Sequence, residues 1–305
     1  MTQNSHPAPS PEHTVAVAIR ETGGGTAPAK RGFVQRALRS PMVLSGLALT
    51  LFIVLVALLG GLVAPFGPTE IVARPYAQPG EGLLLGADAL GRDVFSRVLY
   101  GGRDLIWMSL GAATLGVVLG VAFGTFAAMG GRITENVVMR GVDVLLAFPS
   151  MLLVLLFVSM LGPSPVLLVL LVALTHIAPV SRVTRGAVLP IKDREFVLWA
   201  RLAGFSRLRV IVREILPGIT SPVLVEFGLR LMWSVAVFAA LSFLGYGMQP
   251  PSPDWGLMIN ENRGALRSQP WAMLSPILMV AVFTAGLSLL TEGASRLLNR
   301  TEDAR

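Results

Sequence analysis

Residues 182–217 read RVTRGAVLPIKDREFVLWARLAGFSRLRVIVREILP, and this stretch decides how the rest of the chain is understood. It carries eight basic residues, yet it lies between two long apolar runs, and Gly204 interrupts its own apolar pattern. Basic residues of membrane proteins concentrate in the cytoplasmic connections beside apolar spans. The stretch is therefore predicted to be an ordered cytoplasmic connection between two membrane spans, and so basic a connection needs a partner.

The composition of the whole chain agrees with a membrane protein. Of its 305 residues, 53% are hydrophobic and 14% are charged, and the mean hydropathy is +0.67, which is too apolar for an ordinary soluble domain. The net charge of +7 does not indicate nucleic acid, because the basic residues cluster beside apolar segments and no recognised binding motif accompanies them. The chain has no cysteine, which excludes disulfides, thiolate metal sites and cysteine nucleophiles.

Motifs for nucleotide hydrolysis and metal chemistry are missing from the sequence. No Gly-x-x-x-x-Gly-Lys-Ser/Thr phosphate loop occurs. The histidines His6, His13 and His176 form no His-Glu-x-x-His pattern. The sequence therefore predicts no catalytic residue, no metal site and no cofactor site in this chain, which leaves transport, conduction or scaffolding.

Six apolar segments recur along the chain and predict an all-α integral membrane protein with six transmembrane helices. They cover residues 42–64, 105–129, 137–161, 166–180, 219–244 and 272–290. We expect a disordered cytoplasmic tail at 1–32, since Pro, Ser, Thr and Gly dominate it. Residues 33–104 are expected to form the first transmembrane helix and an outer loop. Residues 105–299 are expected to form a five-helix core that contains the connection 182–217, and residues 300–305 a cytoplasmic tail.

The distribution of Lys and Arg predicts the orientation. With the N-terminus inside, seventeen of these residues near the spans fall on the cytoplasmic side and six on the outer side. Cytoplasmic loops carry the excess of positive charge in membrane proteins. We therefore expect a multi-pass protein of the plasma (inner) membrane with both termini in the cytoplasm.

Residues 196–217 resemble the cytoplasmic loop of the permeases of binding-protein-dependent ABC importers. The family pattern is Glu-Ala-Ala, then Gly four residues after the second Ala, then Leu-Pro about a dozen residues later. The residues that match this pattern are Ala200, Gly204, Leu216 and Pro217. Three residues depart from it, since Leu198, Trp199 and Glu214 stand where the family usually has Glu, Ala and His.

Further stretches resemble the peptide branch of this family, in particular the C-type permease of dipeptide, oligopeptide and nickel importers. They are LGADALGRDVFSR at 85–97, Asp143 with Ala147-Phe148-Pro149, Arg182-x-x-Arg185-Gly186, and LSFLGYGMQPP at 241–251 followed by Trp255-Gly256. The resemblance covers residues 36–299. It implies the fold of a type I ABC importer permease with a cytoplasmic coupling helix.

The same resemblance implies the function and the partners. The expected function is ATP-driven import of dipeptides or oligopeptides by alternating access. The expected partners are a second permease of the related B type, two ATPase subunits that bind the ATP and Mg, an extracytoplasmic solute-binding protein and membrane lipid, with no nucleic acid. Two alternatives remain open: a channel or secondary transporter that works without an ATPase, and a scaffold that recruits a cytoplasmic partner.

The resemblance also implies which residues dock into the ATPase. They are Val197, Leu198, Trp199, Ala200, Arg201, Gly204, Phe205, Arg207 and Leu208. The residue types fit this role, because Val197, Ala200 and Leu208 offer apolar contacts and Gly204 permits a positive φ between two short helices. Pro217 is expected near the start of the fifth span. The alternative is an amphipathic helix that lies on anionic lipid.

Charged residues inside the predicted spans are candidates for the translocation path. Glu226 and Arg230 lie four residues apart, on one face of the fifth span. Charges at membrane depth are costly unless they are paired or face water. We expect Arg230 to meet a peptide carboxylate, and the alternative is a structural pair that neutralises itself. Asp143 is a third candidate, at the inner end of its span, and Pro149 is expected to bend that span.

The outer loops hold the candidates for contact with the solute-binding protein. These are Asp88, Arg92 and Asp93 in the first outer loop and Asp254 and Trp255 in the last one. The alternative is a folded plug that only packs on the protein's own spans. The sequence alone leaves both possibilities open.

Overall fold

The computed structural model describes residues 39–80 and 82–302. The predicted tail 1–32 lies outside the described residues. All described residues fall in one unit by their contacts, Ala37–Arg305. Their regular structure is helical, with isolated β-bridges in the first outer loop.

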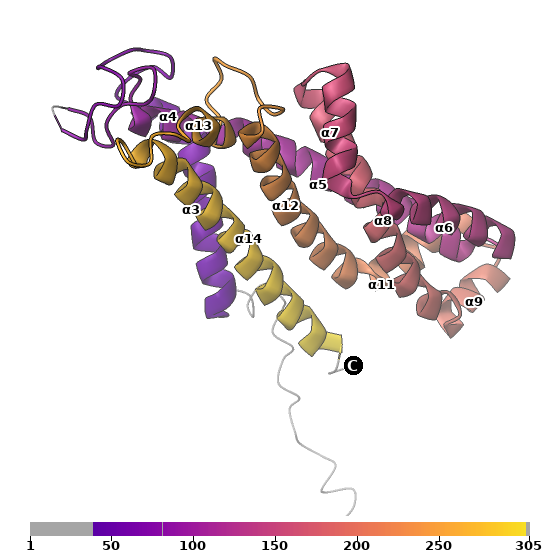
Figure 1. Cartoon of the computed structure of the whole chain (residues 1–305). Coiled ribbons are helices and arrows are strands. Elements are labelled where there is room, and N and C mark those ends of the chain that lie inside the picture. The colour runs from indigo at the N-terminus through magenta and orange to yellow at the C-terminus, as the bar shows by residue number, and fades with distance from the viewer. Residues whose placement is uncertain (1–38, 81, 303–305) are drawn as a thin grey trace, which may run out of the picture. The chain divides into compact units, whose positions relative to one another are not determined.

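Five helices are long and apolar enough to cross a membrane. They are α3 (Pro41–Val63), α5 (Arg103–Met129), which α4 (Val94–Tyr100) precedes, α8 (Pro165–Lys192), α12 (Thr220–Phe243) and α14 (Trp271–Glu302). Figure 1 shows them coloured in chain order, with α3 beside α14. These helices contain the first, second, fourth, fifth and sixth predicted spans, which confirms those five segments.

The predicted third span is broken into two helices. α6 (Arg132–Ala147) and α7 (Ser150–Leu161) meet at an angle of 79°. Phe148 has extended backbone (φ −90°, ψ 131°) and Pro149 directly precedes α7. The residue before a proline is driven away from helical ψ, and proline has no N–H to continue the ladder. The bend expected at Pro149 is therefore confirmed. If α6 and α7 together cross the membrane as one broken span, the chain has six spans, as predicted; otherwise it has five.

Helix starts are set by capping residues at two of the spans. The Ser40 hydroxyl accepts from the Val43 N–H at the start of α3, and Ser164 does the same for Leu167 at the start of α8. A proline follows each serine, at a position where the missing N–H costs nothing. These local signals fix where the two helices begin.

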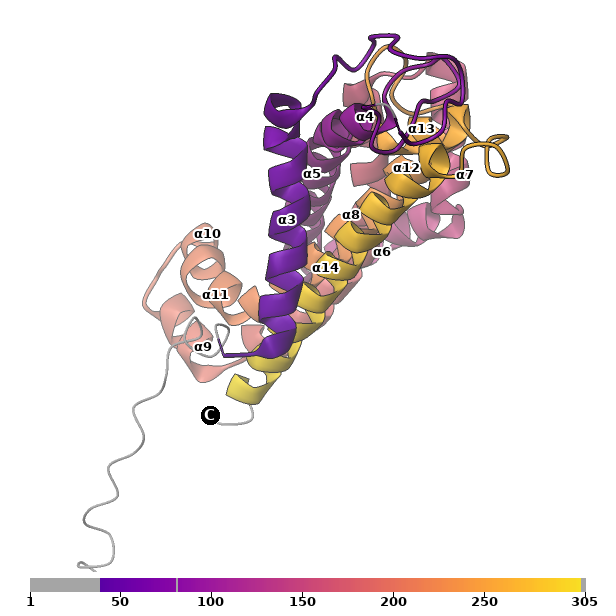
Figure 2. The same ribbon diagram turned by 90° about the vertical axis from the view of Figure 1, so that its left-hand side faces the viewer.

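α5 and α8 pack closely because one face of α5 is formed by glycines. Gly116, Gly120 and Gly124 recur every four residues and face α8. A Cβ on Gly116 would lie 2.5 Å from the Cβ of His176, and one on Gly120 would lie 2.5 Å from the Cβ of Val180. Small residues at this spacing let two membrane helices approach backbone to backbone. Figure 2 shows α5 and α8 behind α3 and α14.

The cytoplasmic connection begins later than predicted. α8 continues without a break to Lys192, so residues 182–192 extend the span instead of forming the first part of a loop. The connection then comprises four short helical pieces, α9 (Glu195–Leu202), α10 (Arg207–Val210), the π-helical η1 (Ile211–Ile215) and α11 (Leu216–Gly218). Pro217 lies three residues before α12, as expected. At the other end, α14 runs to Glu302, so the expected tail 300–305 begins inside a helix.

Two hydrophobic cores result from this arrangement. The larger one joins the spans with α4 and α13 (Trp255–Glu261) on the outer side. The smaller one joins the cytoplasmic ends of α5, α8 and α12 to the connection. It is formed by Ala128, Val188, Val197, Ala200, Val210, Ile215 and Ile219. The cytoplasmic connection is thus a folded element with its own core, seated on the ends of the spans.

Candidate functional site

The cytoplasmic connection turns sharply at Gly204. Its φ of +79° is in the left-handed region, which glycine adopts without the steric cost that a Cβ brings. The Phe205 N–H donates to the Ala200 carbonyl across this turn, as in a helix C-cap. α10 then starts with the Ser206 hydroxyl accepting from the Arg209 N–H. The predicted pair of short helices joined at Gly204 is what the structure contains.

Two of the nine predicted docking residues face inward. Val197 is fully buried and Ala200 is 7% exposed, because both pack in the smaller core against Val188 and Ile215. They therefore hold α9 on the spans, and the expectation that they contact an ATPase directly is corrected. The other seven are exposed: Leu198, Trp199, Arg201, Gly204, Phe205, Arg207 and Leu208.

The exposed face of the connection is strongly apolar. Trp199 is 70% exposed, Leu208 is 72% exposed and Leu202 is 80% exposed. Leu202 was not among the predicted residues, although its position three residues after Trp199 places it on the same helix face. Large apolar side chains this exposed outside the spans mark an interaction surface.

Arginines surround these apolar side chains. The Arg209 guanidinium lies 5.2 Å from the centre of the Phe205 ring, within the range of a cation–π contact. An Arg201 nitrogen lies 3.7 Å from the Met129 sulfur. Arg207 is exposed and forms no ion pair with the side chains that the structure describes, which end at Leu298. The surface thus combines apolar anchors with cations, which suits a protein groove of complementary charge.

Glu226 and Arg230, predicted to lie on one face of the fifth span, form an ion pair. The Arg230 Nε lies 3.1 Å from a Glu226 carboxylate oxygen, and Glu226 is 9% exposed. Glu226 also lines a cavity of about 800 Å³ between α8, α9, α12 and α14, together with Arg194, Ser221 and Ser295. A second polar contact lies further along the span, where His176 Nε2 and Ser234 Oγ are 2.8 Å apart. The span interior therefore offers a charged wall to a cavity that opens towards the cytoplasmic connection.

The third path candidate, Asp143, does not join this pair. It forms an ion pair of 2.5 Å with Arg182, and both side chains are more than half exposed. A neighbouring pair links Glu135 of α6 to Arg185 of α8. The two pairs link α6 to α8. Arginine favours the helical backbone, so α8 carries both residues without ending.

The five predicted contacts for the solute-binding protein are buried. Asp88 and Trp255 are fully buried, and Arg92, Asp93 and Asp254 are 5% exposed or less. Buried side chains cannot reach a docking protein, so these expected contacts are corrected. The alternative, an outer plug that packs on the protein's own spans, is the arrangement observed.

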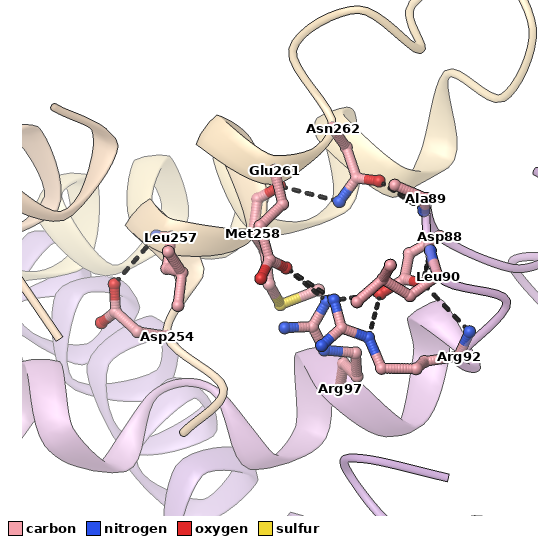
Figure 3. A network of polar contacts seen from close by, with 10 residues as sticks. All are labelled: Asp88, Ala89, Leu90, Arg92, Arg97, Asp254, Leu257, Met258, Glu261 and Asn262. Atoms are coloured by element: carbon pink, nitrogen blue, oxygen red, sulfur yellow. Dashed lines mark hydrogen bonds and ion pairs between the residues drawn. The ribbon is translucent and has the colours of Figure 1, made fainter. Parts of the chain in front are cut away.

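A closed network of charges explains this burial. The Asp88 carboxylate accepts from Arg92 Nε at 2.7 Å and from an Arg97 nitrogen at 2.5 Å. The Glu261 carboxylate of α13 accepts from the same two arginines, each at 2.8 Å. Figure 3 shows the two arginines between the two carboxylates. Arg97 and Glu261 were not predicted, because 164 residues separate them in the sequence.

Trp255 packs at the junction of α4 and α5. Its indole N–H donates to the Val98 carbonyl at 2.9 Å, and its ring lies against Gly102, where a Cβ would approach it to 2.5 Å. Asp254 caps α13 by accepting from the Leu257 N–H at 3.0 Å. Burial, with the Asp104 charge as a smaller cause, raises the pKa of Asp254 to about 6. These contacts fix α13 to the junction of α4 and α5.

Within residues 39–80 and 82–302, no three His, Cys, Asp or Glu side chains are grouped as metal ligands would be. The polar groups of the described chain serve instead as ion pairs, helix caps and exposed surface.

Comparison with known proteins identifies the family. Residues 116–302 match the model of the binding-protein-dependent transport system inner membrane component. The chain is 34% identical over 267 residues to the glutathione transport system permease protein GsiD of Escherichia coli, covering 86% of this chain and 87% of that one. It is 31% identical over 257 residues to the dipeptide transport system permease protein DppC of Haemophilus influenzae, covering 82% and 87%.

A solved structure shares the fold at low sequence identity. A chain of the MetNI methionine ABC transporter, in an inward facing conformation, aligns with a TM-score of 0.54 and 15% identity, covering 65% of this chain and 94% of that one. The fold is therefore that of a type I ABC importer permease. With its several spans, the chain belongs to the binding-protein-dependent transport system inner membrane components, as a multi-pass permease of the ABC importers.

Proposed function

We propose that this chain is a permease subunit of an ATP-driven importer of dipeptides or oligopeptides. The names of its relatives, which transport dipeptides, di- and tripeptides and glutathione, support a peptide substrate. The chain contributes no catalytic residue. ATP and Mg are bound by two partner ATPase subunits, and a second permease of the related type completes the membrane path.

The exposed apolar face of the cytoplasmic connection carries this proposal. Trp199, Leu202 and Leu208 lie outside the spans, on a small folded element that is packed on α5, α8 and α12. A force on this face is transmitted to three spans at once, because the element has a core in common with them. This supports docking of an ATPase subunit here and cytoplasmic termini on the same side, as the charge distribution indicates.

The translocation path runs past Glu226 and Arg230 in the proposed mechanism. ATP-driven closure of the ATPases moves the connections, and the spans reorient around the solute. Arg230 receives the peptide carboxylate, since a guanidinium is the preferred partner of a carboxylate. The cavity beside Glu226 supports a path that continues towards the cytoplasm.

The test of coupling uses the reconstituted complex with its ATPases. Gly204→Pro removes the left-handed turn, and Arg207→Glu reverses an exposed charge of the docking face. We expect both variants to reach the membrane while ATP-dependent peptide uptake falls at least tenfold relative to ATP hydrolysis. The matched control is Arg296→Glu, which reverses an exposed arginine at the cytoplasmic end of α14 and leaves uptake unchanged.

Three outcomes would contradict the proposal. Unchanged uptake in the Gly204 and Arg207 variants removes ATPase docking from this face. Uptake by the chain without ATPase subunits indicates a channel or secondary transporter. For the path, Arg230→Ala with equal uptake of charged and neutral peptides removes Arg230 from carboxylate recognition.

A further inference from the structure

Four exposed arginines on the outer side of the protein form no ion pair with the residues that the structure describes; three lie in the outer loops, and the fourth, Arg103, begins α5. Arg74 lies in the first outer loop, and Arg263 and Arg267 lie in the last one; all three are exposed. Among the residues that the structure describes, none of the three guanidinium groups forms an ion pair. The orientation rule places excess positive charge on the cytoplasmic side. It therefore does not account for these arginines on the outer side.

The described carboxylates of the same region are either buried or accept hydrogen bonds from other groups. Asp88, Asp93 and Asp254 are buried, and Glu261 is held by the two arginines of the network. Asp104 accepts from the Trp107 indole and the Ser252 hydroxyl, and Glu70 accepts from the Gly67 N–H. The network itself is neutral, because it joins two arginines to two carboxylates. Outside the network, the described outer region carries four exposed arginines against the exposed Glu70 and the half-buried Asp104, which leaves a positive excess at its surface.

The three arginines flank the line along which the two outer loops touch. Arg263 follows Asn262, whose side chain accepts from the Ala89 N–H at 3.1 Å. Arg267 precedes Ser268, whose carbonyl accepts from the Gln78 amide. Arg74 and Gln78 line one surface cavity of about 650 Å³. We call Arg74, Arg263 and Arg267 the arginine seam.

The base beneath the arginine seam is firmly held. The Gln269 amide is buried and donates to the Leu85 carbonyl at 2.6 Å and to the Ala77 carbonyl at 3.3 Å. This contact fixes the last outer loop against the first one. A held base fixes the backbone from which the three arginines extend, which reduces the cost of ordering these loops on binding.

We propose that the arginine seam docks an acidic face of the extracytoplasmic solute-binding protein. The inference rests on the proposed function, because it takes the outer side as the side that meets this partner. Complementary charge selects the partner surface, because three exposed cations along the contact of the two outer loops attract a face rich in Asp and Glu and accelerate its association. The seam thereby replaces the buried residues that the sequence suggested for this contact.

The test measures association of the purified solute-binding protein with the whole complex, reconstituted in neutral phosphatidylcholine nanodiscs. Replacing all three arginines with glutamate (R74E, R263E and R267E together) is expected to slow association tenfold or more. Replacing them with glutamine is expected to give a smaller loss and a weaker dependence on salt. The matched control is Arg103→Glu, because Arg103 is exposed at the outer end of α5 but lines a separate cavity with Trp107.

A second measurement uses the lack of cysteine in the chain. A single thiol at Arg267→Cys, joined to a short crosslinker, is expected to attach to an acidic face of the binding protein. The same thiol at Arg103→Cys is expected to attach at least tenfold less. Equal attachment at both positions overturns the proposal.

Two further outcomes would overturn the docking proposal. Unchanged association rates and salt dependence in the three-arginine variants overturn the arginine seam as a docking surface. A loss that occurs only in nanodiscs with anionic lipid assigns the seam to the lipid surface and overturns the proposal as well. Failure of the proposed function is seen separately, since the ATPases then neither co-purify with the complex nor drive uptake, whatever the association rate.

Discussion

Tryptophan and arginine side chains differ in burial and pairing between the outer region and the cytoplasmic connection. Outside, Trp255 is fully buried and the arginines Arg92 and Arg97 are paired with two carboxylates. Inside, Trp199 is 70% exposed and Arg207 is exposed. The charges of the outer network pair with one another within the chain. The cytoplasmic face leaves its tryptophan and arginines open to a partner.

The difference separates buried groups that stabilise the fold from exposed groups that can contact a partner. A buried charge network is costly to break, since each charge left alone has lost its water and its partner. An exposed arginine or tryptophan costs the isolated chain little. Changes to the buried outer groups should therefore lower the stability of the fold, whereas changes to the exposed face of the cytoplasmic connection should lower activity.

The largest effect separates the two tryptophans. Trp255→Ala removes a fully buried ring and should lower the free energy of unfolding by about 3–5 kcal/mol. Trp199→Ala, its matched control, should change it by less than about 0.5 kcal/mol. Denaturant titration in mixed micelles measures both. Equal stability losses at the two positions would abolish the distinction between the regions.

The next effect tests the charge network. Asp88→Asn leaves Arg92 and Arg97 with Glu261 alone and should destabilise the fold by about 3 kcal/mol. The control is Glu292→Gln, which breaks an exposed pair with Arg296 and should cost about 0.5 kcal/mol or less. Thermal unfolding of both variants in the same detergent gives the comparison. A mild effect of Asp88→Asn would mean that the network contributes little.

The smallest effect is a pH dependence confined to the outer region. Because burial raises the pKa of Asp254 from 3.8 to about 6, the folded chain binds an extra proton between about pH 4 and pH 6. Stability from this group is present below pH 4 and is lost as the pH rises through 6, by at most about 3 kcal/mol. Asp254→Asn still caps α13 and should remove this dependence.

The measurement compares both proteins at pH 5 and pH 7.5, so that titration of all other groups cancels. Asp254→Asn should be more stable than the natural protein at pH 7.5, and the advantage should shrink at pH 5. Hydrogen exchange of residues 255–261, corrected for intrinsic rates, localises the change to α13. An equal advantage at both pH values would contradict the raised pKa of Asp254.

Much of the fold could be predicted because its signals are local. An apolar run of sufficient length predicts a span wherever it occurs, and five of the six predicted segments lie in long apolar helices. Pro149 and Gly204 mark breaks through their own backbone limits. The boundary at residue 182 was wrong because charge suggested a loop, whereas Arg182 and Arg185 are paired with α6 and remain helical.

The sites could be predicted only in part, because burial depends on neighbours distant in the chain. Asp88 was expected at the surface, but the fold buries it against two arginines that also pair with the distant Glu261. Val197 and Ala200 looked like docking residues but face the core beneath α9. A helix face is visible in the sequence, yet the sequence does not say what covers it.

The stretch 182–217 shows which features the sequence determines and which depend on tertiary structure. Its sequence alone determined a basic connection between spans with a turn at Gly204, because hydropathy and glycine conformation act within a few residues. Only the tertiary structure decided that the stretch begins as helix, that Val197 and Ala200 point inward, and that the outer charges pair with one another. Those choices depend on contacts between segments far apart in the chain, and such contacts exist only after the helices have packed.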